Sequence, residues 1–151
     1  DENNNLCAIA ESKFFLFDLT RGRISKLPEN IVTMYGTIDK KVFNNDDLPR
    51  LPDPTTYPIF SDKYKIRRFD LDANMHVHNL NYLNFAYELL PESIFYGPEF
   101  NNVEIFFKHE IKLGQTIHSF LYNDPDHKNG YIICIKNEDE TITHSNIKLY
   151  N

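Results

Sequence analysis

From residue 61 onward, the pattern of apolar and polar residues is typical of strands in several stretches. Residues 61–69 alternate so that Lys63, Lys65 and Arg67 are expected to share one face of a strand. Further strands are predicted at residues 103–111, 116–123, 131–136 and 141–150, separated by short segments that contain Gly, Pro, Asn or Asp. This part of the chain is therefore expected to form an antiparallel sheet.

A helical spacing of apolar residues interrupts the strands once. The recurring apolar positions are Leu80, Leu83, Tyr87 and Leu90. Asn79 is a suitable N-cap for this helix, and Pro91 prevents its continuation. The order strand, helix and four strands predicts an α+β fold in which the helix packs its apolar stripe on the sheet. The hot-dog fold, an antiparallel sheet wrapped around one central helix, has this order.

The beginning of the chain carries a second, shorter set of elements. An aromatic run, FFLF, precedes a turn at Gly22, which predicts a β-hairpin over residues 8–27. Pro28 suits the first turn of a short helix that runs to about Tyr35 and stops at Gly36. These elements are too few to form a complete hot-dog sheet.

The segment from residue 37 to residue 58 contains four prolines and the polar run NNDD, and is predicted to be a surface linker. It separates the two sets of elements. We therefore predict a first region at residues 1–35, a linker at residues 36–58 and a complete hot-dog domain at residues 59–151.

Composition and charge narrow the function classes. The chain has 151 residues, 41% of them hydrophobic, which is enough for a packed core. Lys and Arg number 16 against 22 Asp and Glu, for a formal net charge of -6. Because binding to nucleic-acid phosphates needs clustered cations, general nucleic-acid binding is not expected.

Two cysteines, Cys7 and Cys134, are too few for a disulfide framework and too far apart for a CxxC metal site. This favours a reducing compartment, and we expect a cytoplasmic protein. No apolar run is long enough to span a bilayer. The first residue is Asp1 rather than Met, which we interpret as a start inside a longer gene product.

Residues 70–79, DLDANMHVHN, concentrate more polar chemistry than a turn needs. Asp and Asn commonly form turns and cap helices, and for Asp70 and Asn79 we favour that structural interpretation. It does not explain why Asn74 and His76 lie between them. The D-x-N-x-H spacing is therefore the informative part.

Metal binding is one alternative for this loop. Asp70, Asp72 and Asn74 match the first positions of a calcium-binding EF-hand, but Met75 stands where that loop requires Gly. Zinc binding by Asp72 and two histidines lacks a legible third protein ligand. We therefore expect no metal and no cofactor.

The same loop carries a resemblance to a known family. Residues 70–83, DLDANMHVHNLNYL, resemble the signature D-[IL]-D-x-N-x-H-V-N-N-x-x-Y-[IL] of acyl-acyl carrier protein thioesterases of plants and bacteria. Residues 107–110, FKHE, resemble the family's Y-[RK]-[RK]-E segment, and residues 17–28 resemble the end of its first hot-dog domain. The family has two hot-dog domains in tandem. The resemblance implies the tail of the first and the complete second.

The resemblance also implies site residues. Thioester hydrolysis needs an activated water and donors for the oxyanion. His76 is the leading candidate to polarise the thioester or move protons, and Asn74 is suited to orient a water or donate to the oxyanion. Asp72 is expected to hold both in place, and Glu110 to activate the water. Glu110 and His76 are then expected to meet at one cleft.

Two departures from the family pattern affect the details. A thiol nucleophile has been considered for the family at the position after the Glu, but here that residue is Ile111. We therefore favour a water-based route. His78 stands where the family usually has Asn.

The substrate's carrier protein is acidic, so cations near the motif are candidates for steering its approach. The expected carrier-binding residues are Lys63, Lys65, Arg67 and Arg68, with Lys108 and Lys112 nearby. A solvated strand face is the alternative explanation of these cations.

The expected function is hydrolysis of acyl-acyl carrier protein to free fatty acid and carrier protein, a step of fatty acid biosynthesis. A non-catalytic hot-dog module that binds acyl groups or a partner, and a hot-dog acyl-CoA thioesterase, remain alternatives. A lone hot-dog sheet has exposed edges, so a homodimer or pairing with a further hot-dog domain is expected. Neither a nucleic acid nor a membrane is an expected partner.

Overall fold

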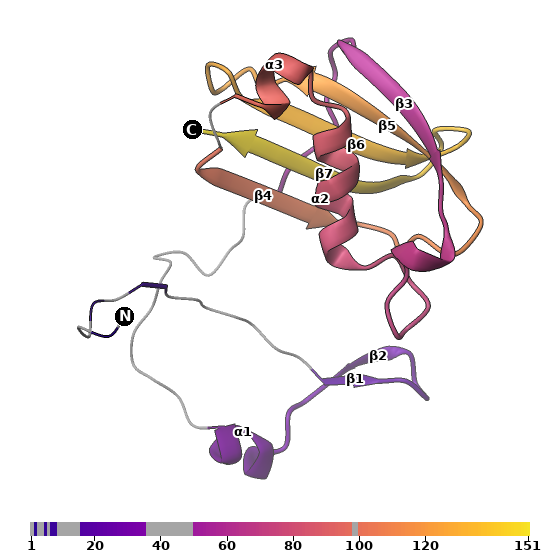
Figure 1. The fold of residues 1–151 in the computed structure, drawn as a ribbon. Coiled ribbons are helices and arrows are strands. Elements are labelled where there is room, and N and C mark those ends of the chain that lie inside the picture. Colours follow the sequence, from indigo (N-terminus) through magenta and orange to yellow (C-terminus); the bar gives the residue numbers. More distant parts are fainter. Residues whose placement is uncertain (1, 3–4, 6, 9–15, 36–49, 98–99) are drawn as a thin grey trace. The chain divides into compact units, whose positions relative to one another are not determined.

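The computed structural model describes residues 2, 5, 7–8, 16–35, 50–97 and 100–151. The chain forms two compact units, Asp1–Leu48 and Pro49–Asn151 (Figure 1). Each unit is considered by itself.

The first unit contains a hairpin and a short helix. Strands β1 (Leu16–Asp18) and β2 (Arg23–Ser25) pair antiparallel, and Gly22 adopts a φ of 61° in the turn between them. The helix α1 (Glu29–Tyr35) follows. The predicted hairpin and helix are thus confirmed where the structure describes them. Residues 9–15 of the predicted strand and Gly36 lie outside the described residues.

The second unit is a five-stranded antiparallel sheet with one long helix, α2 (Asn79–Glu88), across one face (Figure 1). The strands are β3 (Phe60–Lys65), β4 (Asn102–Phe107), β5 (Thr116–Asn123), β6 (Tyr131–Asn137) and β7 (Thr143–Tyr150). Their spatial order is β3-β5-β6-β7-β4. This confirms the predicted α+β hot-dog fold. A short helix, α3 (Glu92–Phe95), was not predicted. No described helix is long and apolar enough to cross a membrane.

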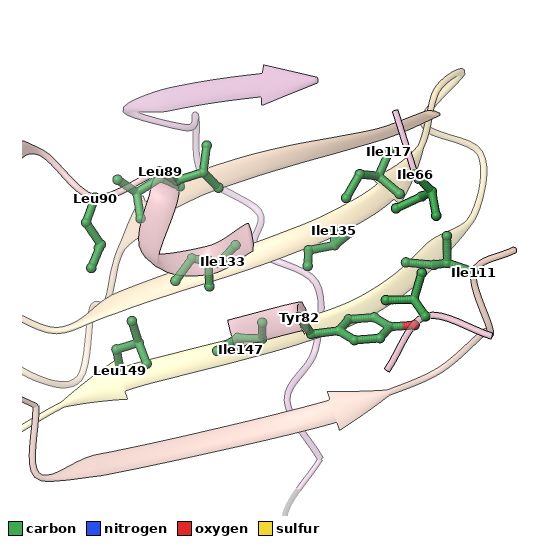
Figure 2. Close-up of a cluster of buried hydrophobic side chains, with 13 residues drawn as sticks. Ile66, Tyr82, Leu89, Leu90, Ile111, Ile117, Ile133, Ile135, Ile147 and Leu149 are labelled. Carbon is green, nitrogen blue, oxygen red and sulfur yellow. The ribbon is translucent and has the colours of Figure 1, made fainter. Parts of the chain in front are cut away.

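The core lies between α2 and the sheet (Figure 2). The sheet contributes six fully buried aliphatic side chains: Ile117, Leu121, Ile133, Ile135, Ile147 and Leu149. From the helix side, Tyr82, Ala86 and Leu89 are buried. Of the predicted stripe, Leu90 is buried and Leu83 and Tyr87 pack partly buried against the core, but Leu80 is 63% exposed, so the prediction is wrong for Leu80. The methyl group of Ala86 allows α2 to approach the sheet closely, so the face that contains Ala86 becomes the buried one.

Two predicted strands end earlier than expected. Strand β3 stops at Lys65, and a 3-10 helix at Arg68–Asp70 follows, so Arg67 does not share the face of Lys63 and Lys65. Strand β4 stops at Phe107, because the next two backbone N–H groups both donate to the carbonyl of His144 and break the ladder. Glu110 consequently lies on an irregular segment rather than on a strand.

The opposite face of the sheet carries a second, smaller apolar cluster of Phe120, Tyr122, Ile132 and Cys134, against which Leu51 packs. Beside it, the Asp53 carboxylate accepts hydrogen bonds from Lys108 Nζ at 2.6 Å, Thr143 Oγ1 at 2.6 Å and Asn146 Nδ2 at 2.8 Å. Residues 50–58 of the predicted linker thus belong to the second unit, and residues 36–49 lie outside the described residues.

Replacing Asp53 with Asn is expected to lower the free energy of unfolding by about 1–2 kcal/mol at pH 7. Burial raises the pKa of this carboxyl, but the hydrogen bonds from Lys108, Thr143 and Asn146 outweigh burial and lower the pKa from 3.8 to about 2. The stabilisation is therefore present above about pH 4 and is lost as the pH falls through about 2. The side chain is 41% exposed, so solvent screening reduces the effect.

Urea unfolding from pH 7 down to pH 3 measures the effect of Asp53→Asn. The control is Asp62→Asn, which removes an exposed carboxylate that accepts a hydrogen bond from the backbone N–H of the next residue. Equal effects of the two substitutions at pH 7, or a difference that does not shrink toward pH 3, would contradict this account.

Candidate active site

The loop between β3 and α2 is a tight turn closed by its own carboxylate. Asp72 Oδ1 accepts the backbone N–H of Asn74 at 2.8 Å and that of His76 at 3.3 Å. The backbone N–H of Asp72 donates to the carbonyl of His76 at 2.8 Å, and Met75 closes the turn with a φ of 64°. Asp72 therefore positions His76 through the backbone.

The loop is also anchored to its surroundings at both ends. The buried carboxylate of Asp70 accepts the backbone N–H of Arg67 at 2.7 Å and the hydroxyl of Tyr64 at 3.0 Å. The side-chain amide of Asn81 donates to the carbonyl of Asp70. These contacts support the structural interpretation of Asp70.

The start of α2 is capped by the residue that departs from the family pattern. His78 is the N-cap, and its Nδ1 accepts the backbone N–H of Leu80 at 3.2 Å. The prediction that Asn79 is the N-cap was therefore wrong by one residue. Imidazole nitrogen can accept this hydrogen bond as the usual Asn oxygen does, provided that Nδ1 is unprotonated.

The segment after β4 lies directly against the loop. Residues His76 and Lys112 form an antiparallel bridge, and the backbone N–H of Val77 donates to the carbonyl of Ile111 at 3.0 Å. This pairing brings the side chains of His76 and Glu110 together, with 2.9 Å between Nε2 and Oε2. The expected meeting of imidazole and carboxylate is present. An ionised carboxylate only accepts hydrogen bonds, so Nε2 carries the proton.

Lys112 completes the arrangement on the other oxygen of the carboxylate. Its Nζ lies 2.8 Å from Glu110 Oε1. This hydrogen bond, with the charges of His76 and Lys112, outweighs desolvation and holds the pKa of Glu110 below its ordinary value. Lys112 was predicted only as part of a basic patch. The signal that could have identified it is its spacing from Glu110, because alternate residues of an extended segment point to the same side.

Removing the Lys112 charge is expected to shift the pH dependence of catalysis. In Lys112→Gln the Glu110 carboxylate loses a hydrogen bond and a nearby positive charge, so the pKa of Glu110 rises. The acidic limb of a kcat/KM profile should therefore move to higher pH. Lys128→Gln is the control, since it removes one exposed charge in the β5–β6 turn, at the other end of the sheet from the loop. A shift in both variants, or in neither, would contradict the assignment.

A pocket of about 220 Å³ opens at this pair. Its lining residues are Asp72, His76, Val77, Asn79, Tyr82, Phe107, Lys108, His109 and Glu110. Three of the predicted catalytic residues, Asp72, His76 and Glu110, thus line one pocket. Asn74, the fourth, is exposed on the turn and is not among the lining residues.

A larger cavity, of about 340 Å³, lies between α2 and β3. Tyr64, Arg67, Asp70 and Phe85 are among its lining residues, and it includes neither His76 nor Glu110. Its size alone therefore does not make it the reaction site. Among the described residues, no group of three or more His, Cys, Asp or Glu side chains could hold a metal ion.

Comparison with known proteins gives this site its context. The family described as "Acyl-ACP thioesterase C-terminal domain" matches residues 56–150, where ACP is acyl carrier protein. The chain belongs to the acyl-ACP thioesterase family. This confirms the resemblance based on the loop at residues 70–83 and on residues 107–110.

Individual acyl-ACP thioesterases are similar to parts of the chain. Oleoyl-acyl carrier protein thioesterase 2 of Arabidopsis thaliana is 32% identical over 84 residues, which are 54% of this chain and 22% of that protein. Dodecanoyl-[acyl-carrier-protein] hydrolase of Cinnamomum camphora is 24% identical over 116 residues, 74% of this chain and 30% of that protein. Both are described as chloroplastic. The chain thus spans less than a third of these relatives.

The solved structure of the 12:0-ACP thioesterase from Umbellularia californica has the same fold. It aligns with a TM-score of 0.72 at 18% identity, over 89% of this chain and 52% of that chain. An acyl-ACP thioesterase from Bacteroides thetaiotaomicron aligns with a TM-score of 0.67 at 15% identity, with the same coverage.

The position after Glu110, which was considered above for a thiol nucleophile, is part of the core. Ile111 is fully buried between the sheet and the loop. Cys134 lies on the opposite face of the sheet, and burial raises the pKa of its thiol to about 11. Since the thiolate is the nucleophile, Cys134 is unsuited to attack a thioester.

Two of the four predicted carrier-binding cations, Lys63 and Arg67, are near carboxylates, as are the nearby Lys108 and Lys112. Lys63 Nζ lies 3.9 Å from Glu138, and Lys108 and Lys112 bind Asp53 and Glu110. The Arg67 guanidinium lies over the ring of Tyr64, and its Nε is 3.9 Å from Asp70 Oδ2. These contacts direct the Arg67 side chain away from the face that carries Lys63. Within the described part of the chain, Lys65 and Arg68 have no ion pair and are exposed.

Proposed function

We propose that the chain contains the catalytic site of a thioesterase that hydrolyses acyl-ACP to free fatty acid and ACP. The observation that carries the proposal is the 2.9 Å contact between His76 and Glu110, at a pocket formed by the family's signature loop. Family membership supports the reaction class. The chain covers less than a third of its curated relatives, so the activity of the whole protein is part of the proposal.

His76 and Glu110 act as one acid–base unit in this proposal. The oxygen of a water molecule attacks the thioester carbon, and the water's proton passes to the pair. Nε2 of His76 is already protonated toward Glu110, so the ring's lone pair at Nδ1 is the acceptor, and the carboxylate stabilises the resulting imidazolium. When the carbon–sulfur bond breaks, the pair returns the proton to the sulfur. The products are a carboxylic acid and the carrier's thiol.

The roles of Asp72 and Asn74 follow from their places in the turn. Asp72 keeps its orienting role through the two backbone N–H groups that it binds. Asn74 is proposed to reach the substrate from the rim of the loop, where its exposed amide can orient a water or donate to the oxyanion. Its own backbone N–H is held by Asp72 at 2.8 Å.

An acidic carrier is proposed to approach the side of the loop that carries Lys65 and Arg68. Phe69, which is 98% exposed, lies beside them and offers an apolar contact. The wider set of Lys63, Lys65, Arg67 and Arg68 adds long-range attraction even where individual cations are paired.

Charge reversal tests the carrier surface. Lys65→Glu and Arg68→Glu are each expected to raise KM for acyl-ACP by about 3–10-fold at low salt, with little change for a small N-acetylcysteamine thioester. Lys128→Glu is the control, because residue 128 lies in the β5–β6 turn, at the other end of the sheet from the loop. Equal effects on KM for acyl-ACP and for the small thioester would contradict the proposed carrier-binding surface.

Residues 1–35 are proposed to be the tail of a first hot-dog domain. The β1–β2 hairpin and α1 are consistent with this. Strand β4 is an edge strand whose Val103 and Phe107 are 45% and 48% exposed, so it is the proposed edge for pairing with a further hot-dog domain or a second copy. The cytoplasmic location predicted from the cysteines stays a prediction.

Parallel assays of acyl-ACP and acyl-CoA test the proposed function. Faster release of free thiol from acyl-ACP is the expected result. Comparable turnover of acyl-CoA would favour the acyl-CoA thioesterase. Binding of acyl-ACP without turnover of either substrate would favour the non-catalytic module. The absence of both binding and turnover would refute the proposal.

A further inference from the structure

Tyr82 is a buried residue on the side of α2 that faces the sheet and the site. The residue is only 3% exposed. Its ring packs edge-to-face on Phe107 with 5.0 Å between the ring centroids. Figure 2 shows the ring extending from α2 with its oxygen on the side of Ile111, the neighbour of Glu110 in sequence. The packing leaves the ring little freedom to move.

The hydroxyl of Tyr82 has no hydrogen-bond partner within the described part of the chain. In that part, the fully buried side-chain atoms without a partner belong to His144, Ser145 and Asn146. The Tyr82 oxygen is not one of them, so it is not sealed from solvent, and Tyr82 lines a pocket with His76 and Glu110. A donor on a buried, packed ring is therefore part of a residue that lines the candidate active site.

The hydroxyl keeps its proton at physiological pH. Burial, and then the negative charge of Glu110, raise the pKa of Tyr82 to about 12. Tyr82 and Glu110 line the same pocket. Tyr82 is thus available as a neutral hydrogen-bond donor and is unsuited to act as a base.

Two other candidate donors to a substrate carbonyl, Asn74 and His76, are less directly placed. The amide of Asn74 lies outside the pocket lining, and the Nε2 proton of His76 is directed to Glu110. A developing oxyanion needs preorganised donors. A hydroxyl fixed by ring packing meets this requirement at no cost in reorganisation.

We propose that Tyr82 is a further catalytic residue, whose hydroxyl donates a hydrogen bond to the thioester carbonyl oxygen as negative charge develops on it. This inference rests on the proposed thioesterase function. The phenol retains its proton throughout, while water's proton passes to the His76–Glu110 pair and then to the leaving sulfur. Tyr82 therefore contributes to stabilising the transition state and takes no part in proton transfer.

Tyr82→Phe is the direct test, because it removes only the oxygen and keeps the ring that packs on Phe107. We expect kcat to fall about 30–300-fold, with KM changed less than about threefold. Tyr122→Phe is the matched control, since Tyr122 is also buried, at 7% exposure, on the opposite face of the sheet. Thermal unfolding of both variants checks the fold. An unchanged kcat in Tyr82→Phe would overturn the inference and leave the proposed function intact.

A second readout separates the hydrogen bond from turnover. A ketone analogue of the substrate, with CH₂ in place of the thioester sulfur, binds without being hydrolysed. Its carbonyl stretching frequency should be lower in the wild-type complex than in the Tyr82→Phe complex. Equal frequencies would overturn the inference even if the chain hydrolyses acyl-ACP. A frequency difference without any turnover would uphold the hydrogen bond and refute the proposed function.

Discussion

Replacing His76 with Ala should lower kcat for acyl-ACP hydrolysis by about 10²–10⁴-fold. The imidazole is the proposed proton acceptor, and without it Glu110 remains bound to Lys112 with a pKa below its ordinary value. A carboxylate with a lowered pKa is a weak base, so it replaces the lost imidazole poorly. Glu110→Gln should have a smaller effect, because the imidazole remains but loses its 2.9 Å carboxylate partner.

The matched control for His76→Ala is His118→Ala. His118 also contacts a glutamate, with 3.0 Å between Nδ1 and Glu140 Oε1, but it lies on β5 and lines neither described pocket. The control therefore shows what the loss of a His–Glu contact away from the pockets does to activity. Initial rates with purified acyl-ACP measure both. Full activity of His76→Ala, or equal losses in the two variants, would refute the site assignment.

Leu89→Ala should lower the free energy of unfolding by about 2–4 kcal/mol, whereas Leu80→Ala should change it by less than about 0.5 kcal/mol. Leu89 follows the last turn of α2 and is 4% exposed, and its side chain contributes to the core between helix and sheet. Leu80 is in the first turn and is 63% exposed. Truncating Leu89 creates a cavity, and truncating Leu80 mainly removes surface that already contacts water.

Urea unfolding at pH 7, followed by circular dichroism, measures both leucine variants. The two substitutions delete the same atoms from leucines at the two ends of one helix, so their difference reports burial. A larger effect of Leu80→Ala would restore the stripe of Leu80, Leu83, Tyr87 and Leu90 that the sequence predicted. Equal effects would mean that α2 does not use one face to pack on the sheet.

The sequence predicted the strands of the sheet more accurately than their ends. A strand was predicted at residues 116–123, and β5 has these bounds. A strand was predicted to continue past Phe107 to residue 111. It ends at Phe107 because the backbone N–H groups of Lys108 and His109 both donate to the carbonyl of His144. A backbone carbonyl from a distant strand leaves no trace in the local pattern. Strand ends that depend on such contacts could not be predicted.

The helix shows the same limit. Its existence and approximate extent followed from spacing and from Pro91, but its rotation did not. Leu80 and Ala86 differ little in their fit to a helical spacing, and only the approach of the sheet decides that the smaller residue is buried. The N-cap is His78 rather than the predicted Asn79, because the loop sets the direction of the chain where the helix begins.

Some residues of the candidate site were predicted from the sequence and others were not. The D-x-N-x-H spacing identified the loop, because polar groups at that spacing are unusual for a simple turn. Glu110 was identified only through the resemblance of FKHE to a segment of the family. The contribution of Lys112 and the place of Tyr82 in the pocket were not predicted, although both stand close to the quoted motifs. A motif in the sequence indicates which residue types lie close together along the chain, but it does not give the distances between separate segments of the chain.

The sequence by itself determined the α+β hot-dog architecture, the family and the polar loop, because each depends on short-range periodicity or on a contiguous motif. Only the tertiary structure decided that His76 and Glu110 lie 2.9 Å apart and that Asn74 stays at the rim. The physical reason is that the two segments are joined by backbone hydrogen bonds between residues more than thirty positions apart, as between Val77 and Ile111. The partners in such contacts are chosen by the packing of the whole sheet.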